Sequence, residues 1–386
     1  MVDESLTDEP LNPGCAAGIL RESRRRVPDP VHDTLAERAA AQLSVEDAQS
    51  LPFRFSGRTD EFFRIWIVNL ALTIVTLGVY SAWAKVRSER YFYGNTTVGG
   101  TPFEYLAEPL AILKGRAIAA LLLLAYVGSS QISPLLNLGV LALLALLFPW
   151  MLTRSLAFRA RYSAWRSIRF GFDGRYGTAF KLYIWYPFLT IFTLYLLFPI
   201  VARQQAEWMA NHHRYGGTPL RFQSDNSQFY AIYLLATVCA VGVGFMIAIL
   251  MGWAMDLMRM LDAAGAESVL ALVGGVAYLG MFAIGVYVRA AVANLMWNGI
   301  EVGGCRFRST ISGWEMAWLF FTNTLAIICS LGLAYPWARI RVARYRAEHL
   351  YFVPMGDPDR FFADAAGNAP AFGSEAGDLF DVDISW

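Results

Sequence analysis

The chain has 386 residues, of which 56% are hydrophobic and only 16% are charged, and its formal net charge is +1. Average soluble domains carry about 25% charged residues, so this composition argues against an ordinary soluble enzyme. The high apolar and aromatic content excludes disorder over most of the chain, and 4 cysteines exclude a disulfide-rich scaffold.

The near-zero net charge hides three regions of different charge. Residues 1–50 carry 5 basic and 10 acidic residues, residues 354–386 carry 1 and 7, and residues 51–353 carry 26 and 14. The first region lacks the apolar core of a signal peptide. We therefore predict an acidic, flexible N-terminal tail (1–50), a basic multi-pass membrane domain (51–353) and an acidic, flexible C-terminal tail (354–386). The aromatic residues of the last tail are either simply solvated or form a docking motif for a protein partner.

Long runs without a charged residue divide the basic region. They cover 65–84, 117–153, 182–202, 226–255, 268–288 and 316–338. A membrane-spanning helix needs about 20 mainly apolar residues, and the longest run is divided by a turn signal at 128–134. The sequence therefore predicts an all-α, polytopic fold with about seven membrane segments, near 62–84, 110–128, 134–153, 180–202, 229–254, 268–289 and 315–338.

Three stretches share one pattern and predict three related units. The units open with Arg54-Phe55, Arg169-Phe170 and Arg306-Phe307, and each continues into an apolar run that is followed by basic residues. Two longer stretches, 110–153 and 229–289, lie between the units, and each is predicted to form a helical hairpin. The openings and the Gly-Gly stretches alternate polar and apolar residues, which indicates short extended segments at the membrane surface.

The combined motifs resemble the YjgN-type family of bacterial inner-membrane proteins, whose function is unknown. The resemblance rests on FRFSGRTDEFF, TLGVYSAWAKVRSERYFYGNTTVGGTPFEY, YSAWRSIRFGFDGRYG and NLMWNGIEVGGCRF with LGLAYPWARIRVARY, and it covers about residues 51–352. It implies a multi-pass location in the inner membrane and no particular activity. The second unit departs from the pattern, because Phe198-Pro199-Ile200-Val201-Ala202 lacks the tryptophan of the other two.

The positive-inside rule gives one consistent orientation and one conflict. The tips of both hairpins lack excess positive charge and are predicted to face the periplasm, whereas their bases face the cytoplasm. Basic residues flank both ends of the segments near 62–84 and 180–202, however. Either these segments are re-entrant, which is tolerated where the backbone is buried in protein, or they span the membrane and one loop violates the charge rule.

Clusters of basic and aromatic residues beside the apolar runs are the first candidate site. Their position favours anchoring at the membrane interface, with specific binding of lipid headgroups as the alternative; a nucleic-acid partner is not expected. The candidate residues are Trp83, Lys85, Arg87, Arg90, Trp165, Arg166, Arg169, Trp337, Arg339, Arg341 and Arg344.

Asn69 and Asn323 occupy matching places in the first and third units and are the second candidate site. An asparagine within an apolar helix seeks a hydrogen bond to a neighbouring helix. The two residues therefore either hold helices together or form an intramembrane polar site.

We find no set of residues that supports catalysis. The sequence contains no metal-binding spacing of histidines, cysteines or acids, no nucleotide-binding loop and no G-x-S-x-G motif, so we expect no cofactor, no metal and no enzymatic activity. We expect an integral inner-membrane protein with a role in transport or lipid handling and with membrane lipids as partners. The alternatives are a scaffold that recruits partners through its acidic tails and, least favoured, a membrane-embedded enzyme.

Overall fold

Ten short strands form a closed antiparallel barrel in the part of the chain that the computed structural model describes, residues 50–259 and 263–354, all of which belong to one compact unit. The predicted tails lie outside these residues except for Ser50 and Pro354. The strands are β1 (Leu51–Phe55), β2 (Thr96–Val98), β3 (Thr101–Tyr105), β4 (Ser163–Trp165), β5 (Ile168–Phe172), β6 (His213–Tyr215), β7 (Thr218–Phe222), β8 (Ile300–Val302), β9 (Cys305–Ser309) and β10 (Leu350–Val353).

Each strand pairs with its neighbours in the sequence, and β1 closes the barrel by pairing with both β2 and β10. At one end of the barrel, two-residue turns join the strands. The turns Gly99-Gly100, Arg166-Ser167 and Gly303-Gly304 have positive φ at both residues, which matches the right-handed twist of the strands that they connect.

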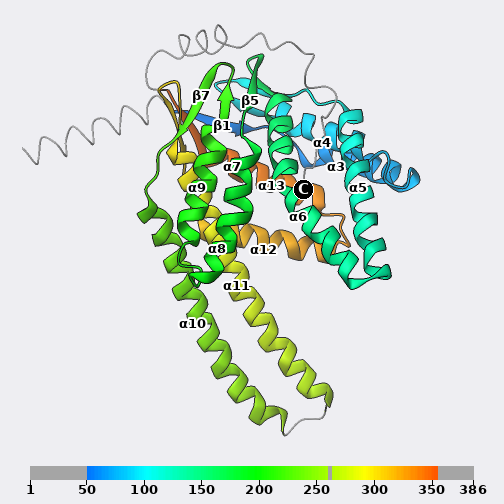
Figure 1. Ribbon diagram of the computed structural model, residues 1–386, viewed down its shortest axis with the longest axis vertical. Helices are drawn as coiled ribbons and strands as arrows, with labels where there is room; N and C mark the ends of the chain where they lie inside the picture. The colour runs from blue at the N-terminus through cyan, green and yellow to red at the C-terminus, as the bar shows by residue number, and fades with distance from the viewer. Residues whose placement is uncertain (1–49, 260–262, 355–386) are drawn as a thin grey trace, which may run out of the picture. The chain divides into compact units, whose positions relative to one another are not determined.

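The other end of the barrel carries the helices of the described residues (Figure 1). Between the two strands of each pair β1–β2, β3–β4, β5–β6, β7–β8 and β9–β10 the chain leaves the barrel, runs through helices and returns. The helices are α3 (Thr59–Val75) and α4 (Ser81–Gly94); α5 (Pro109–Ile132) and α6 (Pro134–Arg161); α7 (Tyr176–Phe180), the π-helix η1 (Lys181–Trp185), α8 (Tyr186–Phe192) and α9 (Phe198–Asn211); α10 (Asn226–Met258) and α11 (Ala263–Gly299); and α12 (Gly313–Cys329) and α13 (Tyr335–Glu348).

One backbone hydrogen bond closes the base of every helical hairpin. The first residue after the odd-numbered strand donates its N–H to the carbonyl of the residue before the even-numbered strand. The bonds are Ser56 to Asn95 (3.0 Å), Leu106 to Tyr162 (2.8 Å), Asp173 to His212 (3.1 Å), Gln223 to Gly299 (2.8 Å) and Thr310 to His349 (3.0 Å). The described chain is therefore built of five units of the form strand, helical hairpin, strand.

The prediction of an all-α fold is wrong, because the barrel supplies a closed sheet. The segments expected to be extended at the membrane surface are its strands. They have three to five residues each, and the proline, glycine and arginine residues among them mask the alternation that normally marks a strand. Only lateral closure with other short strands makes such segments stable.

The prediction of about seven membrane segments is also wrong: in the described residues, four helices are long and apolar enough to cross a membrane, α5, α6, α10 and α11. Ser133, at the predicted break in the longest apolar run, separates α5 from α6, and its hydroxyl accepts from the N–H of Leu135 (3.3 Å). In Figure 1, α10 and α11 extend farthest from the barrel.

The other three apolar segments each fold back on themselves. The N–H groups of Gly78, Tyr195 and Gly332 donate to the carbonyls five residues earlier, each at 2.8 Å, as in the turn that ends many helices. The preceding leucines have φ near +50° and are 85% to 95% exposed: Leu77, Leu194 and Leu331. The resulting helices, such as α3 with 17 residues and α4 with 14, are shorter than the roughly 20 residues of a span.

Both ends of each short hairpin therefore lie at the barrel. This geometry explains why basic residues flank the segments near 62–84 and 180–202 on both sides: each segment returns to the side from which it starts. The two helices of the first hairpin run antiparallel, since Asn69 bonds to Ala84 near the turn and Tyr91 bonds to Arg58 near the base.

Two rings of five side chains line the barrel interior. The middle residues of the odd-numbered strands form one ring, and residues of the even-numbered strands form the other. The first ring is Phe53, Phe103, Phe170, Leu220 and Phe307, and the second is Val98, Trp165, Tyr215, Val302 and Phe352. Neighbouring rings are in contact; Phe103 stacks on Trp165 with ring centroids 5.7 Å apart. Layers of inward side chains are typical of small closed barrels.

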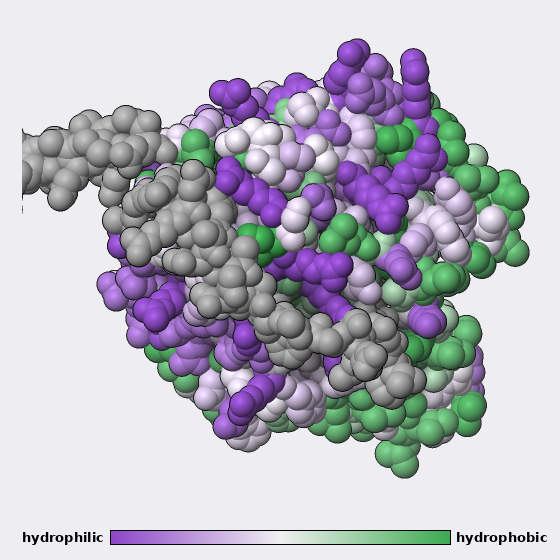
Figure 2. All heavy atoms as spheres, turned by 90° about the horizontal axis from the view of Figure 1, so that it is seen from above, coloured by the Kyte–Doolittle hydropathy of each residue, from purple (hydrophilic) through white to green (hydrophobic). Residues whose placement is uncertain are grey.

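Exposed arginines dominate the outward positions of the same strands: Arg54, Arg169, Arg221, Arg306 and Arg308. Seen from the barrel end, hydrophilic residues gather over the middle of the visible surface, whereas hydrophobic residues form much of its margin (Figure 2). The barrel thus has an aromatic interior and a basic exterior.

Candidate functional site

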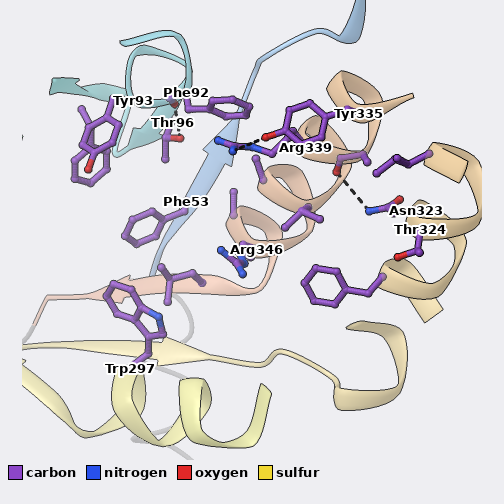
Figure 3. A pocket seen from close by; sticks show the side chains of 18 residues that line it. Phe53, Phe92, Tyr93, Thr96, Trp297, Asn323, Thr324, Tyr335, Arg339 and Arg346 are labelled. Carbon is purple, nitrogen blue, oxygen red and sulfur yellow. Dashed lines mark hydrogen bonds between the residues drawn. The ribbon is translucent and has the colours of Figure 1, made fainter. Parts of the chain in front are cut away.

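Helix α13 lies with one face along a large cavity, whose volume is about 750 Å³. Residues of α13 and the start of β10 recur on this face with the three- and four-residue spacing of a helix: Tyr335, Ala338, Arg339, Val342, Ala343, Arg346, Ala347 and Leu350. Opposite lie aromatic side chains of the barrel, α4, α11 and α12, including Phe53, Phe92, Trp297 and Phe320. The cavity therefore lies between the barrel and the helical hairpins (Figure 3).

Two arginines are the charged groups among the described residues that line this cavity. Arg339 donates to the hydroxyl of Tyr335 (3.2 Å) and lies 4.8 Å from the centre of the Phe92 ring. Arg346, one helical repeat farther on, makes no hydrogen bond or ion pair with any described residue. Arg346 is exposed overall, but partial desolvation against the cavity wall lowers its pKa, and the positive charges of Arg289 and Arg339 lower it further. The described residues that line the cavity include no Asp or Glu, so its positive potential is not neutralised from within.

A second cavity of about 390 Å³ occupies the barrel interior. Its lining includes both rings of five and adds apolar residues from the ends of α9 and α11. Its polar side chains already have partners: the Tyr215 hydroxyl donates to the carbonyl of Trp165 (2.9 Å), and Nδ1 of His213 bonds to the carbonyl of Met209 (2.6 Å). This lumen is therefore an apolar compartment with little to offer a polar ligand.

Phe53, Phe103 and Trp297 line both cavities. The cavity lined by Arg339 and Arg346, here called the basic cavity, thus meets the apolar lumen at three aromatic rings. Together they combine a positive region with an adjoining apolar region, which is the chemical pattern of an amphiphile with a negative headgroup.

Of the predicted site residues, Arg339 and Asn323 line the large cavity. The neighbours of Arg339 on α13 point elsewhere. Arg341 donates to Thr322 Oγ1 (2.6 Å) and Asn323 Oδ1 (3.2 Å) and lies over the Trp337 ring (5.2 Å), while Arg344 reaches the carbonyl of Gly57 (3.4 Å). These contacts join α13 to α12 and to the loop before α3.

The predicted cluster on α4 is divided in the same way. Trp83 packs against a buried cluster around Ala82 and Val86. Arg90 donates to the carbonyls of Tyr105 (3.4 Å) and Ala107 (3.2 Å). Lys85 is half-buried and Arg87 is exposed, and neither lines the two cavities.

The third predicted cluster lies at the turn end of the barrel. Trp165 is part of the lumen, where its Nε1 donates to the carbonyl of Thr101 (3.3 Å). The guanidinium of Arg166 lies 5.5 Å from the centre of the Trp165 ring, and Arg169 is on the outer surface.

Asn69 and Asn323 make equivalent contacts, each within its own hairpin. The Nδ2 group donates to the carbonyl of Ala84 (3.3 Å) in the first case and of Ala338 (3.4 Å) in the second. Their acceptor oxygens differ: Asn323 Oδ1 accepts from Arg341, whereas the buried Oδ1 of Asn69 has no partner in the described structure. Both contacts are of the kind that holds two helices together.

Sequence reasoning missed Arg346 and the aromatic wall. The spacing of Arg339 and Arg346, seven residues apart, was available as a signal. Phe53, Phe103 and Trp297 gave none, because their common position depends on closure of the barrel. The described residues contain no group of three His, Cys, Asp or Glu that could hold a metal ion.

Comparison with known proteins identifies the family. A family described as bacterial proteins of unknown function (DUF898) matches residues 50–379. The chain belongs to this family. The inner membrane protein YjgN of Salmonella typhimurium is 25% identical over 355 residues, which cover 80% of this chain and 89% of that protein. YjgN of Escherichia coli K12 is 30% identical over 140 residues, 35% of this chain and 34% of that protein. No solved structure matches.

These relatives confirm the resemblance that the motifs indicated. Together with the four long apolar helices they also confirm the predicted location, the bacterial inner membrane.

Proposed function

We propose that the protein is a non-enzymatic, multi-pass membrane protein that binds a membrane amphiphile in the cavity between its barrel and its helical hairpins. The observation that carries the proposal is the cavity of about 750 Å³, which has apolar walls and two arginines without a carboxylate among its described lining residues. Clefts of 300–1,000 Å³ that combine apolar walls with a few charged groups are typical ligand sites.

The placement of charge supports one orientation. The barrel carries exposed arginines on its outer face, and basic residues favour the cytoplasmic side, where each gains about 1 kcal/mol near an anionic membrane surface. In the proposed arrangement the barrel lies at the cytoplasmic surface, α5, α6, α10 and α11 cross the bilayer, and the three short hairpins enter it and return. Their exposed leucine tips, such as Leu77 and Leu331, are then covered by lipid.

The same backbone hydrogen bond closes the base of the helical hairpin in all five units, which supports their origin as internal repeats. Two of the units extended their helices into spans, and three kept short hairpins. We therefore propose five related units, whereas the sequence pattern indicated three.

A cavity-filling variant tests the binding function. Ala343 lines the cavity, and Ala343→Trp fills it, whereas Ala142→Trp adds the same bulk on an exposed position of α6. Native mass spectrometry of the full chain, purified in mild detergent, measures the lipid retained. We expect lipid with the wild type and the Ala142 variant and loss with the Ala343 variant, provided that thermal unfolding midpoints agree. Equal lipid retention by both folded variants contradicts the proposal.

A further inference from the structure

The basic cavity and the barrel lumen form one composite site for a negatively charged, single-chain amphiphile: we propose that Arg339 and Arg346 bind its acidic headgroup and that its acyl chain enters the barrel lumen. This inference rests on the proposed amphiphile binding. It adds the charge of the ligand, the residues that bind its headgroup and the position of its acyl chain.

The arginines are suited to an acidic headgroup because they project from the same face of α13. Figure 3 shows both side chains on the cavity side of the helix, Arg339 beside Phe92 and Tyr335, and Arg346 toward Trp297. Arg346 has its five N–H donors available to a ligand, since no described residue accepts from it. A guanidinium binds a carboxylate or a phosphate with two parallel hydrogen bonds, so either headgroup chemistry fits.

The absence of an acidic partner among the described residues strengthens the case for a negative ligand. The positive charges of Arg289 and Arg339 lie near Arg346, and an anion bound between Arg339 and Arg346 offsets the repulsion among these charges. Because the described lining residues include no carboxylate, a cation has no counterpart in this cavity. A neutral headgroup leaves the two guanidinium charges uncompensated.

The lumen is suited to the chain because it offers only apolar contact. Ten side chains in two rings surround it, and the hydroxyl of Tyr215 and Nδ1 of His213 already have partners. Strands enclose this cavity, so an acyl chain inside it is shielded from water although the barrel lies outside the spans. Phe53, Phe103 and Trp297, which border both cavities, mark the passage from headgroup to chain.

Binding assays on the full chain in detergent test the charge of the ligand. The probes are palmitate, hexadecanol as its uncharged counterpart, and phosphatidylglycerol as the two-chain anionic lipid. We expect palmitate to bind at least tenfold more tightly than hexadecanol. The double variant Arg339→Gln/Arg346→Gln loses that preference, by about tenfold for each charged contact removed, while Arg64→Gln, an exposed arginine of α3 outside both cavities, keeps it.

Palmitate and phosphatidylglycerol distinguish the two sources of the ligand. Tighter palmitate binding assigns the site to free acyl acids, as a single chain in the lumen requires. Tighter phosphatidylglycerol binding contradicts the single-chain proposal.

The dependence of affinity on acyl-chain length tests where the acyl chain binds. Affinity for fatty acids from 8 to 18 carbons rises by roughly fourfold for each methylene that becomes buried. Val98→Phe and Val302→Phe narrow the lumen, so the rise stops at a shorter chain, whereas Thr97→Phe on the outer face of β2 leaves it unchanged. If the two lumen variants fold and show the same dependence of affinity on acyl-chain length as the wild type, the acyl chain binds outside the lumen.

The outcomes separate the two levels of the proposal. If lipid binding depends on Ala343 but hexadecanol and palmitate bind equally, the protein binds amphiphiles and the charge assignment is wrong. If neither Ala343→Trp nor the double arginine variant changes lipid binding, the cavity is not the site and both proposals fail.

Discussion

The first and the last helical hairpins, α3–α4 and α12–α13, have the same framework and different cavity faces. In each, a tyrosine hydroxyl near the base bonds to the backbone at the start of the first helix and to a glutamate. Tyr91 contacts Arg58 and Glu61, and Tyr345 contacts Ser312 and Glu315. Each also has one buried asparagine and a leucine at its tip.

The differences between the two hairpins lie where they face the cavity. Arg346 follows Tyr345 directly, whereas Phe92 follows Tyr91. Arg339 occupies the position of Lys85, and only Arg339 lines the cavity. The shared residues therefore build the hairpin, and the residues that differ give one hairpin a charged face. Under the proposed function, this distinction separates the residues that fold the hairpin from the residues that bind the ligand.

Making the last hairpin resemble the first is expected to have the largest effect. Arg346→Phe replaces an exposed charge that has no partner among the described residues by the ring that the first hairpin carries there. Because the replaced side chain is exposed, we expect the free energy of unfolding to change by less than about 0.5 kcal/mol, while binding of anionic amphiphiles falls at least tenfold. Thermal unfolding and palmitate binding, measured on the same preparation, check this. A variant that is both less stable and unimpaired in binding would show that Arg346 has a structural role.

Replacing the buried asparagines, Asn69 and Asn323, compares how much each contributes to the stability of its hairpin. Asn323→Leu removes a bond to Ala338 and leaves Arg341 with one acceptor fewer, so we expect a loss of about 2 kcal/mol. Asn69→Leu removes one bond but also an acceptor that has no partner among the described residues, so its cost is about 1 kcal/mol or less. Unfolding free energies in mixed micelles measure both. Equal costs would mean that the Arg341 contact adds nothing.

Substitutions at the tips of the hairpins are expected to have the smallest effect on stability. Gly78 and Gly332 have φ of +94° in the first and last hairpins, whereas the middle hairpin has Tyr195 at the same place with φ of +64°. Because left-handed backbone costs a non-glycine residue about 1–2 kcal/mol, Tyr195→Gly is expected to raise stability by about 0.5–1 kcal/mol after its own entropic cost. Gly332→Ala is expected to lower it by about 1 kcal/mol. Opposite signs in the shift of the unfolding midpoint confirm this, and a destabilising Tyr195→Gly refutes it.

The helical content and the membrane location could be predicted from the sequence, because long uncharged apolar runs are typical of helices that enter a membrane. The sequence also contained the hairpin turns, since Thr76-Leu77-Gly78 and Ser330-Leu331-Gly332 interrupt apolar runs with a polar residue and a glycine. The closed barrel could not be predicted, because strands of three residues such as Thr96–Val98 are stable only through partners distant in the chain. The same holds for the cavity: Arg339 was found as part of a basic cluster, but Phe53, Phe103 and Trp297 become neighbours only after the barrel closes.

Photo-crosslinking tests the composite site most directly. A palmitate analogue with a diazirine at the end of its chain is bound to the full chain in detergent and irradiated, and the adducts are mapped by peptide mass spectrometry. The proposed site predicts adducts on lumen residues such as Phe103, Trp165 and Tyr215, and their loss in the Val98→Phe variant. Adducts confined to the exposed apolar faces of α5, α10 or α12, with none in the strands, would contradict it.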